Sequence, residues 1–186
     1  MIIPMALKAT VYKATLNIAN LDTHYYEEHS LTLAKHPSET DERLMVRLLA
    51  FAMFANEALT FGKDISEDDE PALWRKDLTG AVDLWIEIGQ PDERIIRKAC
   101  GRSKDVVLIL YGPHTELWWK KNQRDFLNRP NLTIISLPYE STQALAELAK
   151  RSMSLTCNIE DGTMMLMSDT LSVNITPTYL LKRRGL

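Results

Sequence analysis

Alternation of apolar and polar positions predicts β-strands at both ends of the chain. Residues 6–18 alternate over several positions and are rich in β-forming side chains, and residues 25–34 place Leu31 and Leu33 on one face. We expect these two segments to pair as a hairpin with a long connection. Near the other end, Asp161-Gly162 has the composition of a hairpin turn. Around it the pattern predicts three short strands, at residues 154–159, 164–167 and 171–175.

A helical pattern follows the break at His36-Pro37. Ser38 is followed by acidic residues through Glu42, which is typical of a helix that begins with an N-cap hydroxyl. Apolar side chains then recur at helical spacing, at Leu44, Leu48, Phe51 and Ala55. The pattern predicts a helix over residues 38–58.

The middle of the chain alternates between short strands and helices. Residues 59–62 predict a strand, residues 63–71 a polar acidic loop, and residues 72–76 either a strand or a helical turn. A turn at residues 77–80 comes next. It precedes a buried strand at 81–89, a helix at 91–101 and an apolar strand at 105–111. A strand, a helix and a strand in so short a span predict a parallel βαβ unit with a right-handed crossover.

The following segment repeats this order. Residues 116–127 predict a helix, residues 132–137 a strand and residues 142–151 another helix. The basic tail at residues 181–186 is expected to fray. The sequence therefore predicts an α/β fold, with strands from both chain ends added to a central βαβ core.

Charge separates the chain into two halves. The 186 residues suit one domain with a sizeable core, and their net charge of −3 argues against a protein that coats duplex DNA. Residues 1–100 carry a net charge of −6, however, and residues 101–186 carry +3. Carboxylates gathered in one half suit a metal site and a basic half suits an anionic substrate, whereas two ordinary solvated faces are the alternative.

Several classes of protein find no support. The four histidines have no paired-ligand spacing, and there is no glycine-rich phosphate-binding motif, so we expect no nucleotide cofactor. We find no secretory signal and no apolar run long enough for a membrane span, so we predict a cytoplasmic protein without a membrane partner. Cys100 and Cys157 are expected to be reduced, buried thiols.

The densest chemistry lies on the predicted strand at 81–89. Asp83, Trp85 and Glu87 share one face because side chains alternate along a strand. Two carboxylates in an apolar strand are costly to desolvate unless a divalent cation or a basic side chain compensates them. Mg²⁺ favours carboxylate oxygens, so it is one candidate for this compensation, and a pairing with Arg or Lys is the other.

The helix that follows offers basic partners. Arg94 and Lys98 are four positions apart and lie on one helical face, from which Lys98 can point toward Glu87. The alternative is a solvated face on which these residues pair with Asp92 or Glu93. Glu42 is a third acid, either a further metal ligand or simply compensation of the helix dipole.

Two aromatic and two basic residues follow one another in the next predicted helix. Trp118-Trp119 before Lys120-Lys121 could stack against and hold a nucleic acid strand. Packing of the tryptophans against the core, with the lysines in water, explains the pattern equally simply, and we favour it.

Three stretches resemble the bacterial YaeQ family. They are Met5–Thr10 with Tyr12-Lys13-Ala14, Leu31 through Leu49 around His36-Pro37-Ser38-Glu39-Thr40, and Asp83–Glu87 followed by Gly89 and Pro91–Cys100. Asp68-Asp69-Glu70-Pro71 also fits, so the resemblance extends over nearly the whole chain. It implies a restriction-endonuclease-like fold of the PD-(D/E)xK nuclease superfamily, a mixed sheet flanked by helices. That core would cover residues 38–150, within a single domain that adds an antiparallel β subdomain from residues 5–35 and 152–178.

The resemblance also implies residue roles. In that superfamily the acids hold Mg²⁺ and the lysine acts on the attacking water and on phosphate charge. Glu87 matches the Asp/Glu position, whereas Gly89 stands where the lysine is usual, so Lys98 becomes the substitute. Asp83 takes the role of the Asp, which the superfamily usually places on the preceding strand, and Glu42 resembles the extra helical acid. Arg94 and Ser38 are the candidate substrate contacts.

Two functions follow as hypotheses. The first is a Mg²⁺-dependent nuclease or phosphodiesterase with a variant site, in which Asp83, Glu87 and Lys98 are the candidate catalytic residues. The second is a non-catalytic interaction protein on the same fold, linked to nucleic acid or transcription, in which the same carboxylates only pair with Arg94 and Lys98.

Overall fold

Two β-sheets and four helices make up the fold in a computed structural model, which describes residues 8–62 and 69–183. One sheet has five strands in the order β10-β9-β8-β1-β2, and the other has six in the order β11-β7-β6-β5-β4-β3. The elements along the chain are β1 (Thr10–Asn20), β2 (Tyr25–Lys35), α1 (Asp41–Met53), β3 (Leu59–Phe61), β4 (Leu73–Lys76), β5 (Val82–Ile88), α2 (Glu93–Arg102), β6 (Ser103–Leu110), α3 (Thr115–Phe126), β7 (Leu132–Ser136), α4 (Tyr139–Ala146), β8 (Ser152–Glu160), β9 (Thr163–Met167), β10 (Ser172–Ile175) and β11 (Thr178–Leu181).

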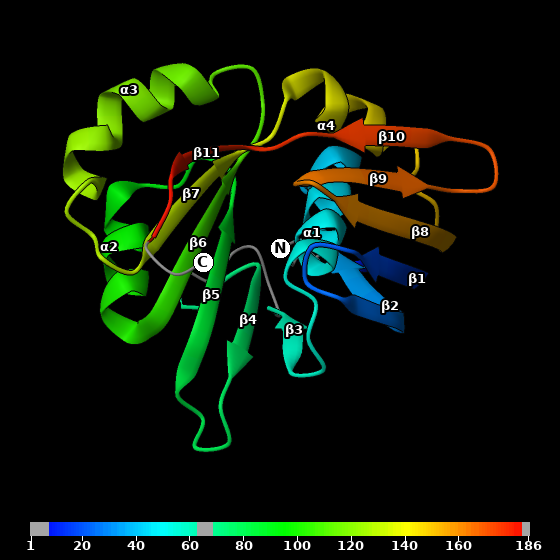
Figure 1. The fold of residues 1–186 in the computed structure, drawn as a ribbon, viewed down its shortest axis with the longest axis horizontal. Coiled ribbons are helices and arrows are strands. Elements are labelled where there is room, and N and C mark those ends of the chain that lie inside the picture. The colour runs from blue at the N-terminus through cyan, green and yellow to red at the C-terminus, as the bar shows by residue number, and fades with distance from the viewer. Residues whose placement is uncertain (1–7, 63–68, 184–186) are drawn as a thin grey trace, which may run out of the picture.

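The elements stack in four layers (Figure 1). Helices α1 and α4 lie between the two sheets, and α2 and α3 cover the far face of the six-stranded sheet. One apolar core joins the inner faces of both sheets through α1, with Leu16 and Leu155 on one side and Ile86 and Ile109 on the other. A second core, around Trp85 and Phe126, lies beneath α2 and α3.

Helix α1 is buried on every side. All nine residues from Leu44 to Ala52 are buried, including the charged Arg47, because a sheet lies on each side of the helix. The helix is shorter than the predicted 38–58. Thr40, rather than Ser38, is the N-cap, since its side chain accepts a hydrogen bond of 3.1 Å from the Arg43 N–H.

The local predictions for the strands are confirmed. β1 and β2 form an antiparallel hairpin, although the connection from Leu21 to His24 is short rather than long. β5, α2 and β6 form the predicted parallel unit, and β7 extends it in parallel. The Asp161-Gly162 turn joins β8 to β9, and both turn residues have positive φ, at 50° and 72°, as a type I′ hairpin turn requires.

Two pairings were not predicted. β1 and β8 pair in parallel, so the added five-stranded sheet is mixed rather than antiparallel. β11 is an edge strand on β7, and it includes only Leu181 of the tail that was expected to fray. Of the two alternatives for residues 72–76, the strand is confirmed, since Leu73–Lys76 form β4 beside β5. Most of the predicted acidic loop, residues 63–68, lies outside the described residues.

The two cysteines differ in burial. Cys157 is fully buried, and burial raises the pKa of its thiol to about 12, whereas Cys100 is only half-buried. Both thiols are free. Within the described parts of the chain, no helix has the length and apolar character needed to cross a bilayer.

Candidate functional site

Strand β5 presents its polar face to helix α2. Trp85 is buried against Ile96 and Ala99 of that helix, whereas Leu84 and Ile86 face the core around α1. The Trp85 indole N–H donates a hydrogen bond of 3.2 Å to Glu87 Oε2. The Glu87 carboxylate is therefore held on the α2 side of the sheet, at the carboxyl end of a parallel strand, where open α/β sheets place their ligands.

Asp83 lies on the same face of β5 as Glu87, but far from it along the strand. It lies four positions before Glu87 on the strand, a span of about 13 Å, with the Trp85 side chain between them. Its nearest charged partner is Arg75 on the neighbouring strand β4, with 3.9 Å from Nε to Asp83 Oδ2. Two carboxylates so far apart along a strand do not meet at one Mg²⁺, whose ligand oxygens lie about 2.1 Å from the ion.

Lys98 instead meets an acid from another segment. Its Nζ forms an ion pair with Asp69 Oδ1, and Arg102, one helical turn further on, lies 3.4 Å from the same oxygen. The hydrogen bond from Lys98 and its charge hold the pKa of the Asp69 carboxyl below its usual value. Asp69 remains largely exposed, at 73 %, so this is an open ion pair rather than a buried network.

Topology places Asp69 at the same end of the sheet as Glu87. β4 runs antiparallel to β5 with Leu73 opposite Ile86, so the chain that leads into β4 passes beside the carboxyl end of β5. The Gly62 N–H bonds the Ala72 carbonyl at 2.9 Å and closes the loop that carries Asp69. Only glycine fits at position 62, because a Cβ there would lie 1.9 Å from the Pro71 oxygen.

Arg94 pairs with Asp92 on a solvated face of α2, which is the alternative to a functional role that the sequence left open. Asp92 is the N-cap of α2 and accepts a hydrogen bond of 2.9 Å from the Arg94 N–H. The Arg94 side chain lies 3.3 Å from the same carboxylate and is 80 % exposed, on the surface of the helix that carries Lys98. It is available to a bound anion without a change of fold.

Ser38 and Glu42 lie elsewhere. Ser38 Oγ contacts His36 Nδ1 at 2.6 Å, within the loop before α1. Glu42 Oε1 accepts a hydrogen bond of 2.7 Å from Thr142 Oγ1 of α4. α1 and α4 pack on the face of the six-stranded sheet opposite α2, so Glu42 and Glu87 project from opposite sides of that sheet.

The tryptophan pair on α3 takes the structural role. Trp118 stacks on the buried Phe126 with ring centroids 5.6 Å apart, and Trp119 packs against the same core. Lys120 and Lys121 are exposed beside them. The aromatic rings are thus largely committed to the core, and the lysines remain as surface charge.

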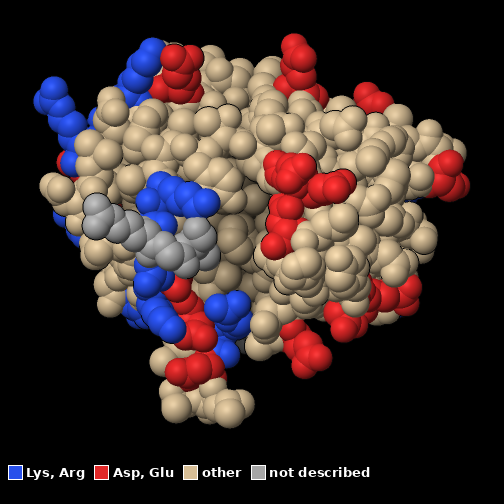
Figure 2. Space-filling view, in the orientation of Figure 1, with Lys and Arg blue, Asp and Glu red and all other residues tan. Residues whose placement is uncertain are grey.

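Charge is unevenly distributed over the surface. On the face shown in Figure 2, the Lys and Arg side chains gather on the side of the six-stranded sheet, α2 and α3, interspersed with some acidic side chains, whereas the charged side chains visible on the other side are Asp and Glu. Among the residues that the structure describes, no three His, Cys, Asp or Glu side chains are grouped to hold a metal ion. Asp69, paired with Lys98, and Glu87, at the carboxyl end of β5, are two carboxylates with hard oxygen donors at this end of the sheet.

Sequence reasoning selected Asp83 and did not consider Asp69 as the partner of Lys98. The signal available for Asp69 was the Asp68-Asp69-Glu70-Pro71 run, which is part of the family resemblance. Spacing on a single strand favoured Asp83, and only the β4–β5 pairing shows which acid reaches Lys98.

Comparison with known proteins decides the family. The family model described as YaeQ protein matches residues 5–177. The chain belongs to the YaeQ family. It is 45% identical over 175 residues to the uncharacterized protein YaeQ of Escherichia coli K12, a match that covers 92% of this chain and 97% of that protein. The uncharacterized YaeQ of Salmonella typhi is 44% identical over 163 residues, 87% of this chain and 90% of that protein.

Solved YaeQ structures have the same architecture. The crystal structure of YaeQ from Xanthomonas axonopodis pv. citri matches with a TM-score of 0.90 and 53% identity over 92% of this chain and 98% of that one. That of YaeQ from Pseudomonas syringae matches with a TM-score of 0.90 and 37% identity over 95% of this chain and 98% of that one. The two sheets and four helices described above are thus the architecture of YaeQ proteins.

Proposed function

We propose that this YaeQ protein is a Mg²⁺-dependent nuclease or phosphodiesterase with a site formed by Asp69, Glu87 and Lys98. The observation that carries the proposal is the ion pair of Lys98 with Asp69, at the end of the sheet where Glu87 projects toward α2. An aspartate before one strand, a glutamate on the next and a lysine from the following helix reproduce the PD-(D/E)xK residue types with the lysine moved.

The proposed fold assignment is restriction-endonuclease-like. In support, α1, β3, β4, β5, α2 and β6 follow one another as helix, three strands, helix and strand, which is the order of that core. β3, β4 and β5 are antiparallel neighbours and β6 is parallel to β5. On this assignment β5 is the strand that carries the (D/E)xK glutamate, and the segment before β4 carries the aspartate.

Each residue has a chemical task in this proposal. Asp69 and Glu87 offer carboxylate oxygens, the ligands that Mg²⁺ prefers. When bound there, Mg²⁺ would polarise a phosphoryl oxygen and lower the pKa of an attacking water. Lys98, released from Asp69, would orient that water or stabilise the charge on a phosphate oxygen, and Arg94 would contact a neighbouring phosphate. A nucleic acid strand would lie over the side rich in Lys and Arg on the face shown in Figure 2.

The alternative is a non-catalytic interaction protein on the same fold, linked to nucleic acid or transcription. The pairing of Asp69 with both Lys98 and Arg102 favours it, because this carboxylate already has two cationic partners. Metal binding separates the two functions, since it requires Asp69 to exchange Lys98 for a divalent cation.

Calorimetric titration with Mg²⁺ and Mn²⁺ tests the site. We expect micromolar-to-millimolar binding by the wild type and its loss in Glu87→Gln and Asp69→Asn, because each removes a ligand charge. Asp83→Asn is the matched control and is expected to bind like the wild type, since Asp83 lies about 13 Å along the strand. Binding lost in Asp83→Asn but kept in Asp69→Asn would return the site to Asp83, and no binding by the wild type would favour the non-catalytic function.

A further inference from the structure

The five-stranded sheet contains a stretch of strand that is paired on one side only. β8 pairs with β1 along nearly its whole length, from Ser152 opposite Lys13 to Ile159 opposite Asn20. On its other side β9 pairs only from Thr156 to Glu160, because β9 ends at Met167. Among residues 8–62 and 69–183, no strand therefore lies beside residues 152–155 of β8 on the β9 side.

The backbone of this stretch has hydrogen-bonding groups to offer. The Lys13 N–H donates to the Arg151 carbonyl at 2.9 Å, so the odd-numbered residues of β8 bond to β1. The even-numbered residues face the other way, where Thr156, Asn158 and Glu160 bond to β9. Ser152 and Ser154 turn their N–H and C=O groups in the same direction, and no described residue bonds to them there.

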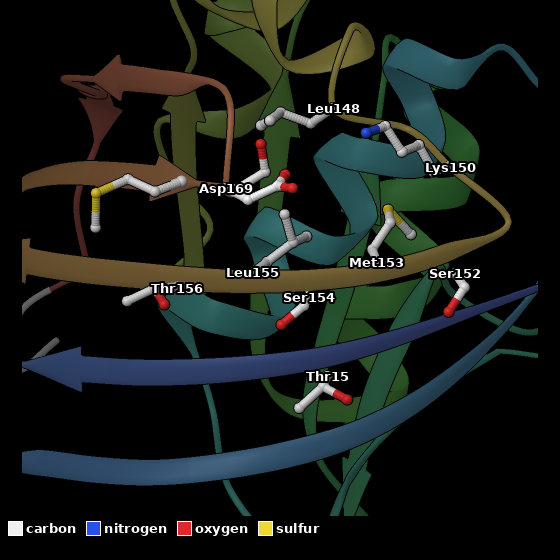
Figure 3. Close-up of a pocket in the computed structure, with 11 residues that line it drawn as sticks. Thr15, Leu148, Lys150, Ser152, Met153, Ser154, Leu155, Thr156 and Asp169 are labelled. Carbon is white, nitrogen blue, oxygen red and sulfur yellow. The ribbon is translucent and has the colours of Figure 1, made fainter.

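A pocket of about 720 Å³ lies along this edge. Its walls come from two loops: Leu148 and Lys150 precede β8, and Ser168 and Asp169 follow β9. Met153 and Leu155 form an apolar base at the strand itself. In Figure 3, Asp169 lies above the Leu155 end of the strand and Lys150 above the Met153 end.

Two charged side chains, Lys150 and Asp169, lie at opposite ends of the pocket. Neither Lys150 nor Asp169 forms an ion pair or side-chain hydrogen bond among the described residues, and both are exposed. A strand that continues the line of β9 would run antiparallel to β8. Its amino end would lie near Asp169 and its carboxyl end near Lys150, so a basic group at the first end and an acidic group at the second complement the pocket.

We propose that residues 152–155 of β8 bind an extended peptide segment of another protein as an added antiparallel strand. The segment spans about four residues, or about 13 Å. Main-chain bonds to Ser152 and Ser154 supply affinity, and a small apolar side chain directed inward meets Met153 and Leu155. This site is separate from the proposed Asp69–Glu87–Lys98 site and does not depend on it.

Fluorescence anisotropy with designed peptides tests the proposal on the full chain. The probe is a fluorescein-labelled peptide Lys-Val-Thr-Val-Thr-Glu, compared with its charge-reversed form Glu-Val-Thr-Val-Thr-Lys. We expect saturable binding that is tighter for the first peptide. Lys150→Glu should remove this preference, and Lys150→Glu combined with Asp169→Lys should invert it. Hydrogen exchange at the Ser152 and Ser154 amides of the wild type should slow when the first peptide is bound.

Ser154→Pro removes the outward N–H without removing a bond to β1, and proline is tolerated at such an edge position. We expect it to weaken binding at least about tenfold, whereas Ser154→Ala, which keeps the N–H, should bind like the wild type. Unchanged binding by Ser154→Pro, or no saturable binding of either peptide to the wild type, overturns the proposal. A concentration-dependent dimer of the wild type that Ser154→Pro abolishes overturns it as well, because the edge then belongs to a second copy of the chain.

Discussion

Arg47→Ala is expected to lower the free energy of unfolding by about 3–5 kcal/mol, because it leaves a buried carboxylate without its main partner. Arg47 and Glu39 form a two-pronged ion pair, with Nε–Oε1 and Nη2–Oε2 both at 2.8 Å. Their side chains are 4 % and 0 % exposed. Arg47 Nη2 also donates to the Ala34 carbonyl at 2.9 Å, so the pair ties the end of β2 and the loop after it to α1.

Burial lowers the pKa of the Arg47 guanidinium, and the charge and hydrogen bonds of Glu39 oppose that effect. Urea unfolding followed by tryptophan fluorescence measures the loss. Arg43→Ala is the matched control. It removes a single bond of 3.1 Å to Glu39 and leaves the two-pronged pair intact, so we expect a loss of about 1 kcal/mol. Equal losses in the two variants would show that the buried pair is not what holds α1 in place.

Lys98→Met is expected to reduce phosphodiester hydrolysis at saturating metal by at least about 100-fold. In the proposed mechanism Lys98 is the residue of α2 that orients the attacking water or hydrogen-bonds the reacting phosphate. The same change removes the cation that pairs with Asp69, so the pKa of the Asp69 carboxyl should rise toward its usual value and Mg²⁺ should bind at least as tightly as before. The variant therefore separates rate from metal affinity.

Hydrolysis rates on labelled DNA and RNA strands measure the loss of activity, and calorimetry on the same samples measures the Mg²⁺ affinity. Lys104→Met is the matched control, because Lys104 is an exposed lysine at the start of β6, at the opposite end of the sheet from Glu87. It removes the same charge and should keep the wild-type rate. A Lys98→Met protein that keeps its rate, or that loses metal binding together with the rate, contradicts the role assigned to Lys98.

Local sequence patterns predicted most of the elements. Alternation located β1 and β2, the apolar runs located β5 and β6, and Asp161-Gly162 located the turn between β8 and β9. These features depend on side chains close together in the sequence, so a local pattern contains the information. The end of α1 was harder, because apolar residues continue to Ala55 after the helix ends at Met53.

Long-range pairing was not predictable in the same way. The parallel contact of β1 with β8 joins residues about 140 positions apart, and no local sequence pattern in either strand identifies the other as its partner. The burial of Arg47 follows from a sheet on each side of α1, which helical spacing alone does not reveal. The candidate site shows the same limit, since Asp69 reaches Lys98 only because β4 lies beside β5.

Hydrolysis by the wild-type protein and by Glu87→Gln, with Mg²⁺ and with EDTA, tests the central claim most directly. The substrates are labelled single-stranded and duplex DNA and RNA. The account predicts cleavage of at least one substrate by the wild type in Mg²⁺, none in EDTA, and at least about a 100-fold loss in Glu87→Gln. Cleavage that persists in Glu87→Gln, or no cleavage by a wild-type protein on any of these substrates, would contradict a phosphodiester hydrolase at Asp69, Glu87 and Lys98.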